Sequence, residues 1–122
     1  MADHSPAFLA LVDAARSRIR EIPAEDLGDR LQAHANARLI DVREASEFAA
    51  GHVIGAQWLG KGIIERDIEV ACPDPDTPIY LYCGGGYRSA LAADNLTRMG
   101  YRAVHSVQGG WRALQALLPT EV

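Results

Sequence analysis

The sequence predicts a single α/β domain with a central, mostly parallel five-stranded sheet flanked by helices on both faces. Short apolar runs alternate with helical patterns along its 122 residues, which is typical of βαβ units around a parallel sheet. A chain of this length can bury one real core, and we expect no second large domain. The 48% hydrophobic and 23% charged residues are those of an ordinary globular protein.

A helix is predicted first, over residues 5–17. Its apolar residues form one stripe: Phe8, Leu11, Val12 and Ala15. We expect this stripe to dock on the rest of the domain rather than to bind a partner. Residues 1–18 are accordingly interpreted as an N-terminal helical extension and residues 19–122 as the main domain.

The remaining elements follow in alternation. Strands are predicted at residues 18–21, 37–42, 56–59, 78–82 and 103–107. Helices are predicted at residues 23–34, 44–50, 61–69, 89–99 and 110–117. Pro23 and the acidic residues after it favour a helix start, whereas Gly100 is typical of a helix end. The proline-rich segment 72–78 predicts a surface loop.

Charge and cysteine content exclude several classes of protein. A net charge of −4 and a pI near 5.5 argue against a nucleic-acid-binding protein, so we expect a small, mobile substrate or partner. Two cysteines without a CxxC pair or Cys/His spacing indicate neither a disulfide framework nor a metal site. The apolar stretch 7–12 is too short to span a membrane and resembles no export signal. We therefore expect a cytoplasmic protein with no membrane contact.

The principal candidate site is Cys83, which ends an apolar strand-like run and opens a glycine-rich loop. Gly84, Gly85 and Gly86 let successive N–H groups turn toward one point, and the next helix adds its positive N-terminal end there. A thiol in such a cradle is expected to act as a nucleophilic thiolate. The alternative, a buried cysteine beside a flexible loop, is less consistent with this pattern.

Neighbouring residues supply the rest of the predicted site. Tyr87 either lines the mouth of the site or packs over the first helical turn. Arg88, at the end of the loop, is expected to orient the loop through a buried pair with a carboxylate such as Asp41, its alternative role being to attract an anionic donor. Asp41 ends a strand at the same edge of the sheet as Cys83.

Three stretches together resemble the rhodanese-homology family of sulfurtransferases. They are the run from Leu39 to Glu44 with the later Gly51–Ala56, the loop from Cys83 to Ser89, and the closing Val107–Trp111. The resemblance covers about residues 19–118 and implies a single rhodanese-like domain. It also implies supporting roles for Asp41 and Arg43 beside the Cys83 loop.

By this resemblance, Cys83 takes sulfane sulfur from a small donor such as thiosulfate as a persulfide and passes it to cyanide or a thiol. This is covalent catalysis without a metal or an organic cofactor. A persulfide relay or binding module with a protein partner is an alternative. Related arsenate reductases and phosphatases have one residue more between the cysteine and the arginine, so the six residues from Cys83 to Arg88 favour sulfur transfer.

Other polar residues have simpler interpretations. We expect His52 to be structural rather than a catalytic base, Glu47 to pair with a cation or to cap a turn, and Trp111 to anchor packing. Lys61 and Arg66 either add positive potential near the site or form a solvated helix face. Cys72 is expected to be a dispensable residue of the connector, with a resolving thiol as the alternative.

Overall fold

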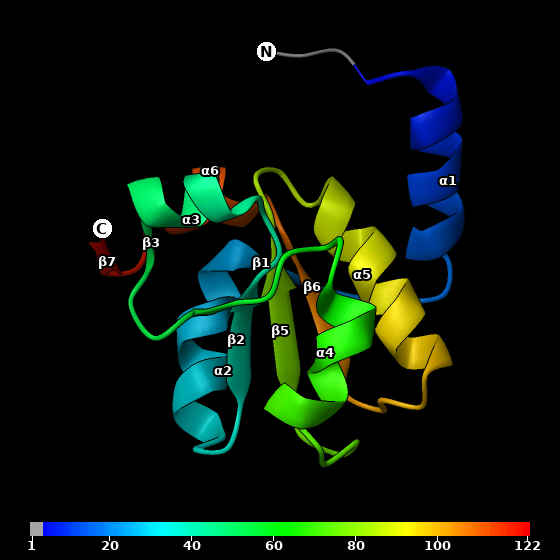
Figure 1. Ribbon diagram of the computed structural model, residues 1–122. Helices are drawn as coiled ribbons and strands as arrows, with labels where there is room; N and C mark the ends of the chain where they lie inside the picture. The colour runs from blue at the N-terminus through cyan, green and yellow to red at the C-terminus, as the bar shows by residue number, and fades with distance from the viewer. Residues whose placement is uncertain (1–3) are drawn as a thin grey trace.

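The computed structural model describes residues 4–122 and places a five-stranded sheet between two layers of helices (Figure 1). The strands run in the order β1 (Arg20–Pro23), β6 (Val104–Gln108), β5 (Ile79–Tyr82), β2 (Arg38–Asp41) and β4 (Gln57–Trp58). All neighbouring strands are parallel. The predicted α/β fold is therefore confirmed, and its main sheet is wholly parallel.

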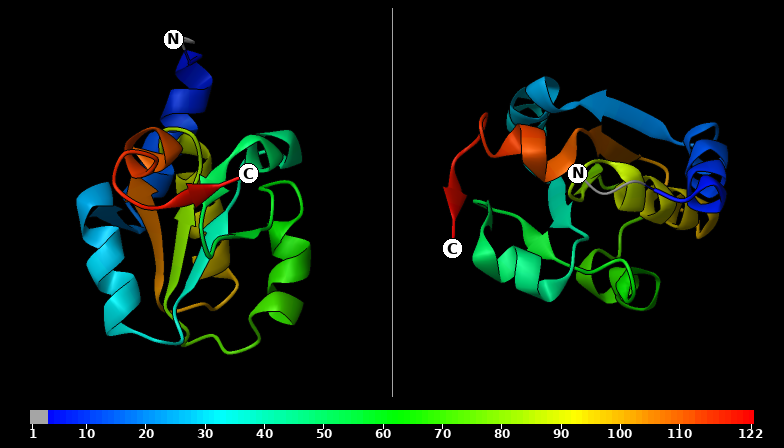
Figure 2. Two further views of the ribbon diagram at one scale, coloured as in Figure 1. Left: turned by 90° about the vertical axis from the view of Figure 1, so that its left-hand side faces the viewer. Right: turned by 90° about the horizontal axis from the view of Figure 1, so that it is seen from above.

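Helices cover both faces of the sheet (Figure 2). The helices are α1 (Pro6–Arg16), α2 (Leu27–Ala33), α3 (Ala45–Ala50), α4 (Ile64–Ala71), α5 (Tyr87–Arg98) and α6 (Gly110–Leu114). The core on one face packs under α4 and α5, and includes Ile40, Ile64 and Leu96. The core on the other face packs under α2 and α6, and includes Leu39, Leu27 and Leu114. Successive residues of β2 thus point to opposite faces, as the period of a strand requires.

Several predicted boundaries are wrong in detail. The helix predicted from residue 23 begins instead with a 3-10 turn at Ala24–Asp26. Helix α5 starts at Tyr87, two residues earlier than predicted, because Gly86 makes the turn from strand to helix with a φ of 99°. A two-stranded antiparallel sheet, β3 (His52–Val53) with β7 (Thr120–Glu121), was not predicted, since two-residue strands leave no alternation to detect.

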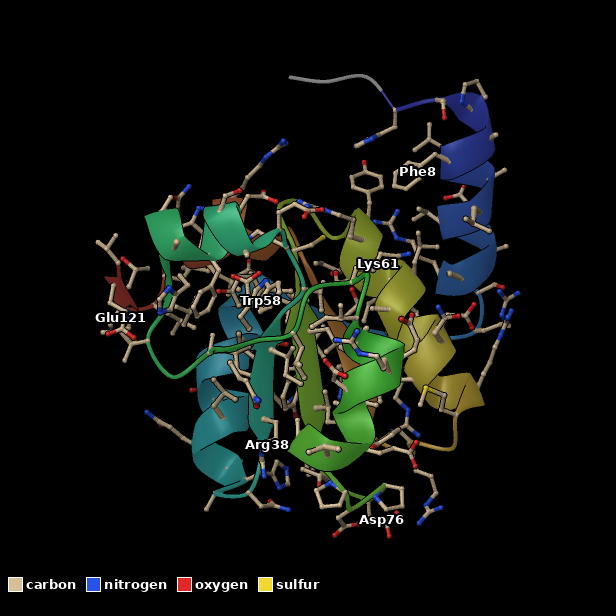
Figure 3. All side chains as sticks on the ribbon, viewed as in Figure 1. Phe8, Arg38, Trp58, Lys61, Asp76 and Glu121 are labelled. Carbon is tan, nitrogen blue, oxygen red and sulfur yellow. The ribbon has the colours of Figure 1, made fainter. Side chains whose placement is uncertain are left out.

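Helix α1 docks on α5, as predicted, but Leu11 of its predicted apolar stripe is 58% exposed. Val12 and Ala15 are fully buried. Beyond the helix, Arg18 binds Asp94 of α5 through two hydrogen bonds of 3.0 and 2.7 Å. At the other end of α1, Phe8 points toward the start of α5 (Figure 3). None of the helices within residues 4–122 is long and apolar enough to cross a membrane.

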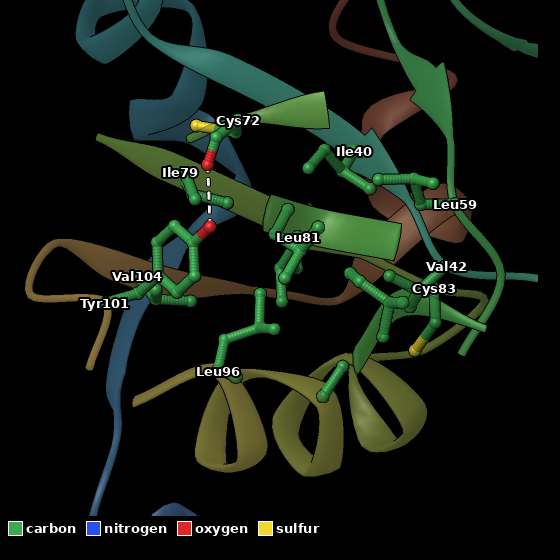
Figure 4. Close-up of a cluster of buried hydrophobic side chains, with 14 residues drawn as sticks. Ile40, Val42, Leu59, Cys72, Ile79, Leu81, Cys83, Leu96, Tyr101 and Val104 are labelled. Atoms are coloured by element: carbon green, nitrogen blue, oxygen red, sulfur yellow. Dashed lines mark hydrogen bonds between the residues drawn. The ribbon is translucent and has the colours of Figure 1, made fainter. Parts of the chain in front are cut away.

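Cys72 differs from its predicted place in a surface connector. Its side chain is 1% exposed and belongs to the core, and its carbonyl accepts a 2.6 Å hydrogen bond from the Tyr101 hydroxyl. The reason is that α4 continues to Ala71, so Cys72 caps a packed helix and the exposed loop begins after it. Figure 4 shows Cys72 and Cys83 toward opposite ends of β5.

Candidate active site

The loop after β5 meets the end of β2 and the start of α6 at the carboxyl edge of the sheet. Asp41 is the last residue of β2 and pairs in register with Tyr82, the residue before Cys83. Helix α6 follows directly after β6, the other neighbour of β5. Since carboxyl ends of parallel strands share one edge, three segments distant in sequence converge around Cys83.

Cys83 lies at the floor of its loop, with its side chain 1% exposed. The Gly86 N–H donates to Cys83 Sγ at 3.1 Å, which closes the loop around the sulfur. The thiol also contacts Ser89 Oγ at 3.5 Å, and Ser89 is joined to Ser106 by a 2.8 Å hydrogen bond. Both serines are fully buried. A row of two hydroxyl groups therefore extends from the sulfur into the protein.

Helix α6 binds the outer side of the loop. The N–H groups of Trp111 and Arg112 donate to the carbonyls of Cys83 and Gly84 at 2.7 and 3.2 Å. In a trans peptide the N–H points away from the C=O, so the N–H groups of Gly84 and Gly85 turn away from α6.

Gly110 makes this close approach possible. Its φ is 50°, and a Cβ there would collide with the Cys83 carbonyl. The sequence alone indicates no such role for Gly110. The pair of glycines before Trp111 was a visible signal, but the carbonyl that Gly110 approaches lies 27 residues earlier and could not be inferred from spacing.

Arg88 pairs with a carboxylate, as predicted, but the partner is Glu47 rather than Asp41 and the pair is not buried. Its guanidinium binds both carboxylate oxygens of Glu47, at 2.8 and 3.4 Å. The pair is part-exposed, with 33% of the Arg88 side chain and 37% of the Glu47 side chain accessible. The hydrogen bond between them lowers the pKa of Glu47 and raises the pKa of Arg88. Glu47 thus pairs with a cation and also closes the capping box of α3.

Asp41 pairs instead with Arg43, two residues later. The Arg43 side chain binds Asp41 Oδ2 at 2.8 Å and Asp41 Oδ1 at 3.1 Å, and both side chains are buried. Burial opposes the charge on Arg43, but the hydrogen bond and the charge of Asp41 outweigh it and raise the pKa of Arg43. Arg43 also donates to the Gly51 carbonyl at 2.7 Å. The buried positive charge of Arg43 and the buried negative charge of Asp41 therefore neutralise each other.

This buried pair reaches the loop through Trp111. The Arg43 guanidinium lies 4.7 Å from the centre of the Trp111 ring, a cation–π contact. The Trp111 N–H in turn donates to the Cys83 carbonyl. The Asp41–Arg43 pair is hence linked to the Cys83 loop through Trp111, which contacts Arg43 with its ring and the loop with its backbone N–H.

A pocket of about 310 Å³ opens onto the loop. Cys83, Gly84 and Gly85 line it together with side chains from other elements: His4, Phe8, Tyr87, Arg88 and Arg112. Tyr87 therefore lines the mouth, the first of its two predicted roles. A larger hollow of about 470 Å³ lies at the far end of the sheet beside Arg20 and Arg102, but its lining includes no cysteine, serine or histidine and we assign it no chemistry.

Three predicted polar residues lie outside the Cys83 pocket. His52 stacks on Phe48 with ring centres 3.7 Å apart and bonds the Phe48 carbonyl at 2.8 Å, a structural arrangement. Arg66 pairs with its neighbour Asp67 on an exposed helix face. Lys61 lines a different hollow beside Trp58. Among residues 4–122 there is no group of three His, Cys, Asp or Glu side chains that could hold a metal ion.

Comparison with known proteins adds a family and a set of structural neighbours. A family model described as "Rhodanese-like domain" matches residues 23–117. An uncharacterized protein of Bacillus subtilis (strain 168), YqhL, is 36% identical over 80 residues, which are 65% of this chain and 61% of that protein. The chain therefore spans less than two thirds of this relative.

Two solved structures are also similar. The first, from Rhodopseudomonas palustris CGA009, is described as a protein of unknown function and possible tyrosine phosphatase. It superposes with a TM-score of 0.83 at 29% identity, over 99% of this chain and 99% of its own. The second is described as a rhodanese with anions from E. coli, and superposes with a TM-score of 0.64 at 29% identity, over 70% of this chain and 96% of its own.

Proposed function

Because this chain belongs to the rhodanese-like domain family, we propose that it is a sulfurtransferase that carries sulfane sulfur on Cys83. One observation carries the proposal. The sulfur atom lies at the floor of a six-residue loop, where the Gly86 N–H reaches it at 3.1 Å. A donor held at this distance stabilises negative charge on sulfur before and after transfer.

The first half of the reaction loads the cysteine. The Cys83 thiolate attacks the outer sulfur of a donor such as thiosulfate, and a new S–S bond forms to Cys83. The S–S bond of the donor breaks, and sulfite leaves with its electron pair. The Gly84 and Gly85 N–H groups turn away from α6, and we expect them to donate to the outer sulfur of the persulfide.

The second half transfers that sulfur to cyanide or to a thiol. The acceptor attacks the outer sulfur, the Cys83 S–S bond breaks, and its electron pair returns to Sγ. Thiocyanate or a small persulfide is the product. Both halves move only sulfur and an electron pair, so the chemistry uses no metal or organic cofactor.

Phosphoryl transfer is the competing activity, because the Rhodopseudomonas structure is described as a possible tyrosine phosphatase. Two features of this chain favour sulfur. The loop from Cys83 to Arg88 has only six residues, so it offers fewer N–H groups to surround a tetrahedral oxyanion. The Arg88 guanidinium already binds both oxygens of Glu47, which neutralises part of the positive charge that would attract a phosphate.

A protein persulfide is the other donor that the same chemistry would serve. With Cys83 only 1% exposed, the donor sulfur would have to enter the pocket on a projecting side chain. Relay and small-molecule transfer therefore share the Cys83 persulfide, and detection of that species tests both.

Intact-protein mass spectrometry tests the proposal. Purified protein treated with thiosulfate should gain the mass of one sulfur atom and lose it on addition of cyanide. Cys83→Ser should not gain it, whereas the matched Cys72→Ser should load as the wild type does. Loading of Cys83→Ser at the wild-type level, or phosphatase turnover faster than sulfur transfer, would contradict the proposal.

A further inference from the structure

We propose that helix α1 forms the acceptor-selecting wall of the Cys83 pocket and that it selects low-molecular-weight thiols with an apolar or aromatic body. This inference rests on the proposed function, since it names the acceptor class for the same persulfide. Its starting point is that the pocket is not built from the family-matched residues alone: the family model begins at residue 23, but His4 and Phe8 line the pocket.

The wall is a cluster of three rings gathered at the mouth. The His4 ring lies 4.4 Å from the Tyr87 ring and 5.2 Å from the Phe8 ring, and Phe8 lies 6.3 Å from Tyr87. These separations are those of favourable aromatic pairs. Phe8 points from α1 toward the start of α5, where the Cys83 loop ends (Figure 3).

The wall is also held in place. The Arg16 guanidinium, two turns further along α1, lies 5.0 Å from the centre of the Tyr87 ring. Val12 and Ala15 are fully buried where α1 docks, and Ser5 caps the helix through a 3.3 Å bond from the Phe8 N–H. The position of Phe8 is therefore set by a docked, capped helix and not by a free chain end.

The size and chemistry of the pocket decide what the wall can select. About 310 Å³ is at the lower end of the roughly 300–1,000 Å³ of small-molecule sites, and cyanide or thiosulfate alone would leave much of it empty. An organic thiol can place its sulfur at the floor and its body against Phe8 and His4. Arg88, which is paired with Glu47, and Arg112 also line the pocket.

The acceptor step balances without any further reactant. The thiolate RS⁻ attacks the outer sulfur of the protonated persulfide, Cys83–S–SH, and a new RS–S bond forms. The Cys83 S–S bond breaks and its electron pair stays on Sγ. The products are RSSH and the Cys83 thiolate. The Gly86 N–H, which donates to Sγ at 3.1 Å, stabilises that thiolate.

Single-turnover discharge of the loaded protein tests the inference. The full-length chain is loaded with thiosulfate and freed of donor, and the loss of the added sulfur is followed by mass with benzyl mercaptan, 2-mercaptoethanol or cyanide. We expect the wild type to react faster with benzyl mercaptan than with 2-mercaptoethanol. Phe8→Ala should lower the ratio of the benzyl mercaptan rate constant to the cyanide rate constant about fivefold, the effect of losing one aromatic contact.

Leu11→Ala is the matched control, because Leu11 lies on the same helix, is 58% exposed and does not line the pocket. It should keep the wild-type ratio. His4→Ala, which precedes the helix and cannot open the core, should lower the ratio in the same direction as Phe8→Ala. An unchanged ratio in both His4→Ala and Phe8→Ala would overturn the inference while leaving the proposed function intact. Failure of the wild type to load would instead overturn the proposed function.

Discussion

Arg88 at the end of the Cys83 loop is bound by Glu47 of α3, with 2.8 Å between the closest nitrogen and oxygen. The two residues are 41 positions apart in the chain. This pair ties the loop to a different βα unit of the fold, and it occupies the guanidinium that an oxyanion substrate would otherwise bind.

Replacing Glu47 by Gln should change stability only slightly, because a part-exposed ion pair contributes under about 1 kcal/mol. Gln also preserves the capping of α3. Since pairing lowers the pKa of Glu47 from 4.5, its contribution is present above pH 4.5 and is lost as the pH falls through the folded-state pKa. Urea unfolding should therefore show a small difference between the two proteins at pH 7 that shrinks as the pH falls below 4.5. A difference that grows on acidification would contradict this assignment.

Asp41→Asn should destabilise the fold far more. Arg43 would stay buried without its anion, which costs about 3–5 kcal/mol. The control is Asp76→Asn, since Asp76 pairs with Arg102 at the surface and both side chains are about two-thirds exposed. Urea unfolding at pH 7 should show a large loss for Asp41→Asn and a loss under about 1 kcal/mol for the control. Equal losses in the two variants would show that Asp41 is not the charge partner that matters.

Ser89→Ala should slow the loading of Cys83 about tenfold. The Cys83 thiol donates to the Ser89 hydroxyl at 3.5 Å. When the thiol ionises, that hydroxyl can turn to donate to the thiolate, and we expect this single contact to matter less than the hundredfold effect of a well-placed donor. Ser106→Ala is matched to it, because each change breaks the same buried Ser89–Ser106 bond and should destabilise by a similar 1–3 kcal/mol or so. Stopped-flow measurement of loading with thiosulfate should distinguish the two variants, because the loading rate should fall less in Ser106→Ala than in Ser89→Ala. Identical loading rates would rule out a role for the Ser89 hydroxyl at the sulfur.

Gly110→Ala should impair the loop, because the new Cβ would meet the Cys83 carbonyl at a positive φ. The carbonyl must then move, and the N–H groups opposite it move as well. We expect loading to fall by about tenfold or more. Gly62→Ala is the control, since nothing lies within 4 Å of its Cβ position, and it should load normally. Wild-type loading by Gly110→Ala would contradict the proposed anchoring of the loop by α6.

Cys72 should take no part in turnover. Cys72 and Cys83 lie toward opposite ends of β5, which has four residues (Figure 4). A strand of that length is about 13 Å long, whereas the Cα atoms of bridged cysteines lie within about 7 Å. Peptide mapping after mild oxidation should thus find no Cys72–Cys83 disulfide. Cys72→Ala should keep turnover but lose about 1 kcal/mol of stability, because the thiol is in the core. A dominant bridge together with lost turnover would instead identify Cys72 as a resolving thiol.

Local patterns in the sequence were sufficient to predict the order along the chain of the helices and of the five strands of the main sheet, and the place of Cys83. A strand, three glycines and a helix start are contiguous, so backbone preferences and periodicity alone specify that turn. The docking of α1 was predictable for a similar reason, since its stripe of apolar residues has to be buried somewhere.

What the sequence by itself determined is therefore the α/β fold and the position of Cys83 at the start of its glycine loop, both of which depend on neighbouring residues. Only the tertiary structure decided which carboxylate binds Arg88, which backbone segment anchors the Cys83 carbonyl, and which side chains from α1 complete the pocket. Asp41 and Glu47 were both possible partners for Arg88 near the same edge of the sheet. In the fold, the short turn after β2 brings Arg43 onto Asp41, and Arg88 pairs with Glu47. Such pairings depend on how helices and strands far apart in the chain are oriented relative to one another, and the spacing of residues along the chain carries no information about that orientation.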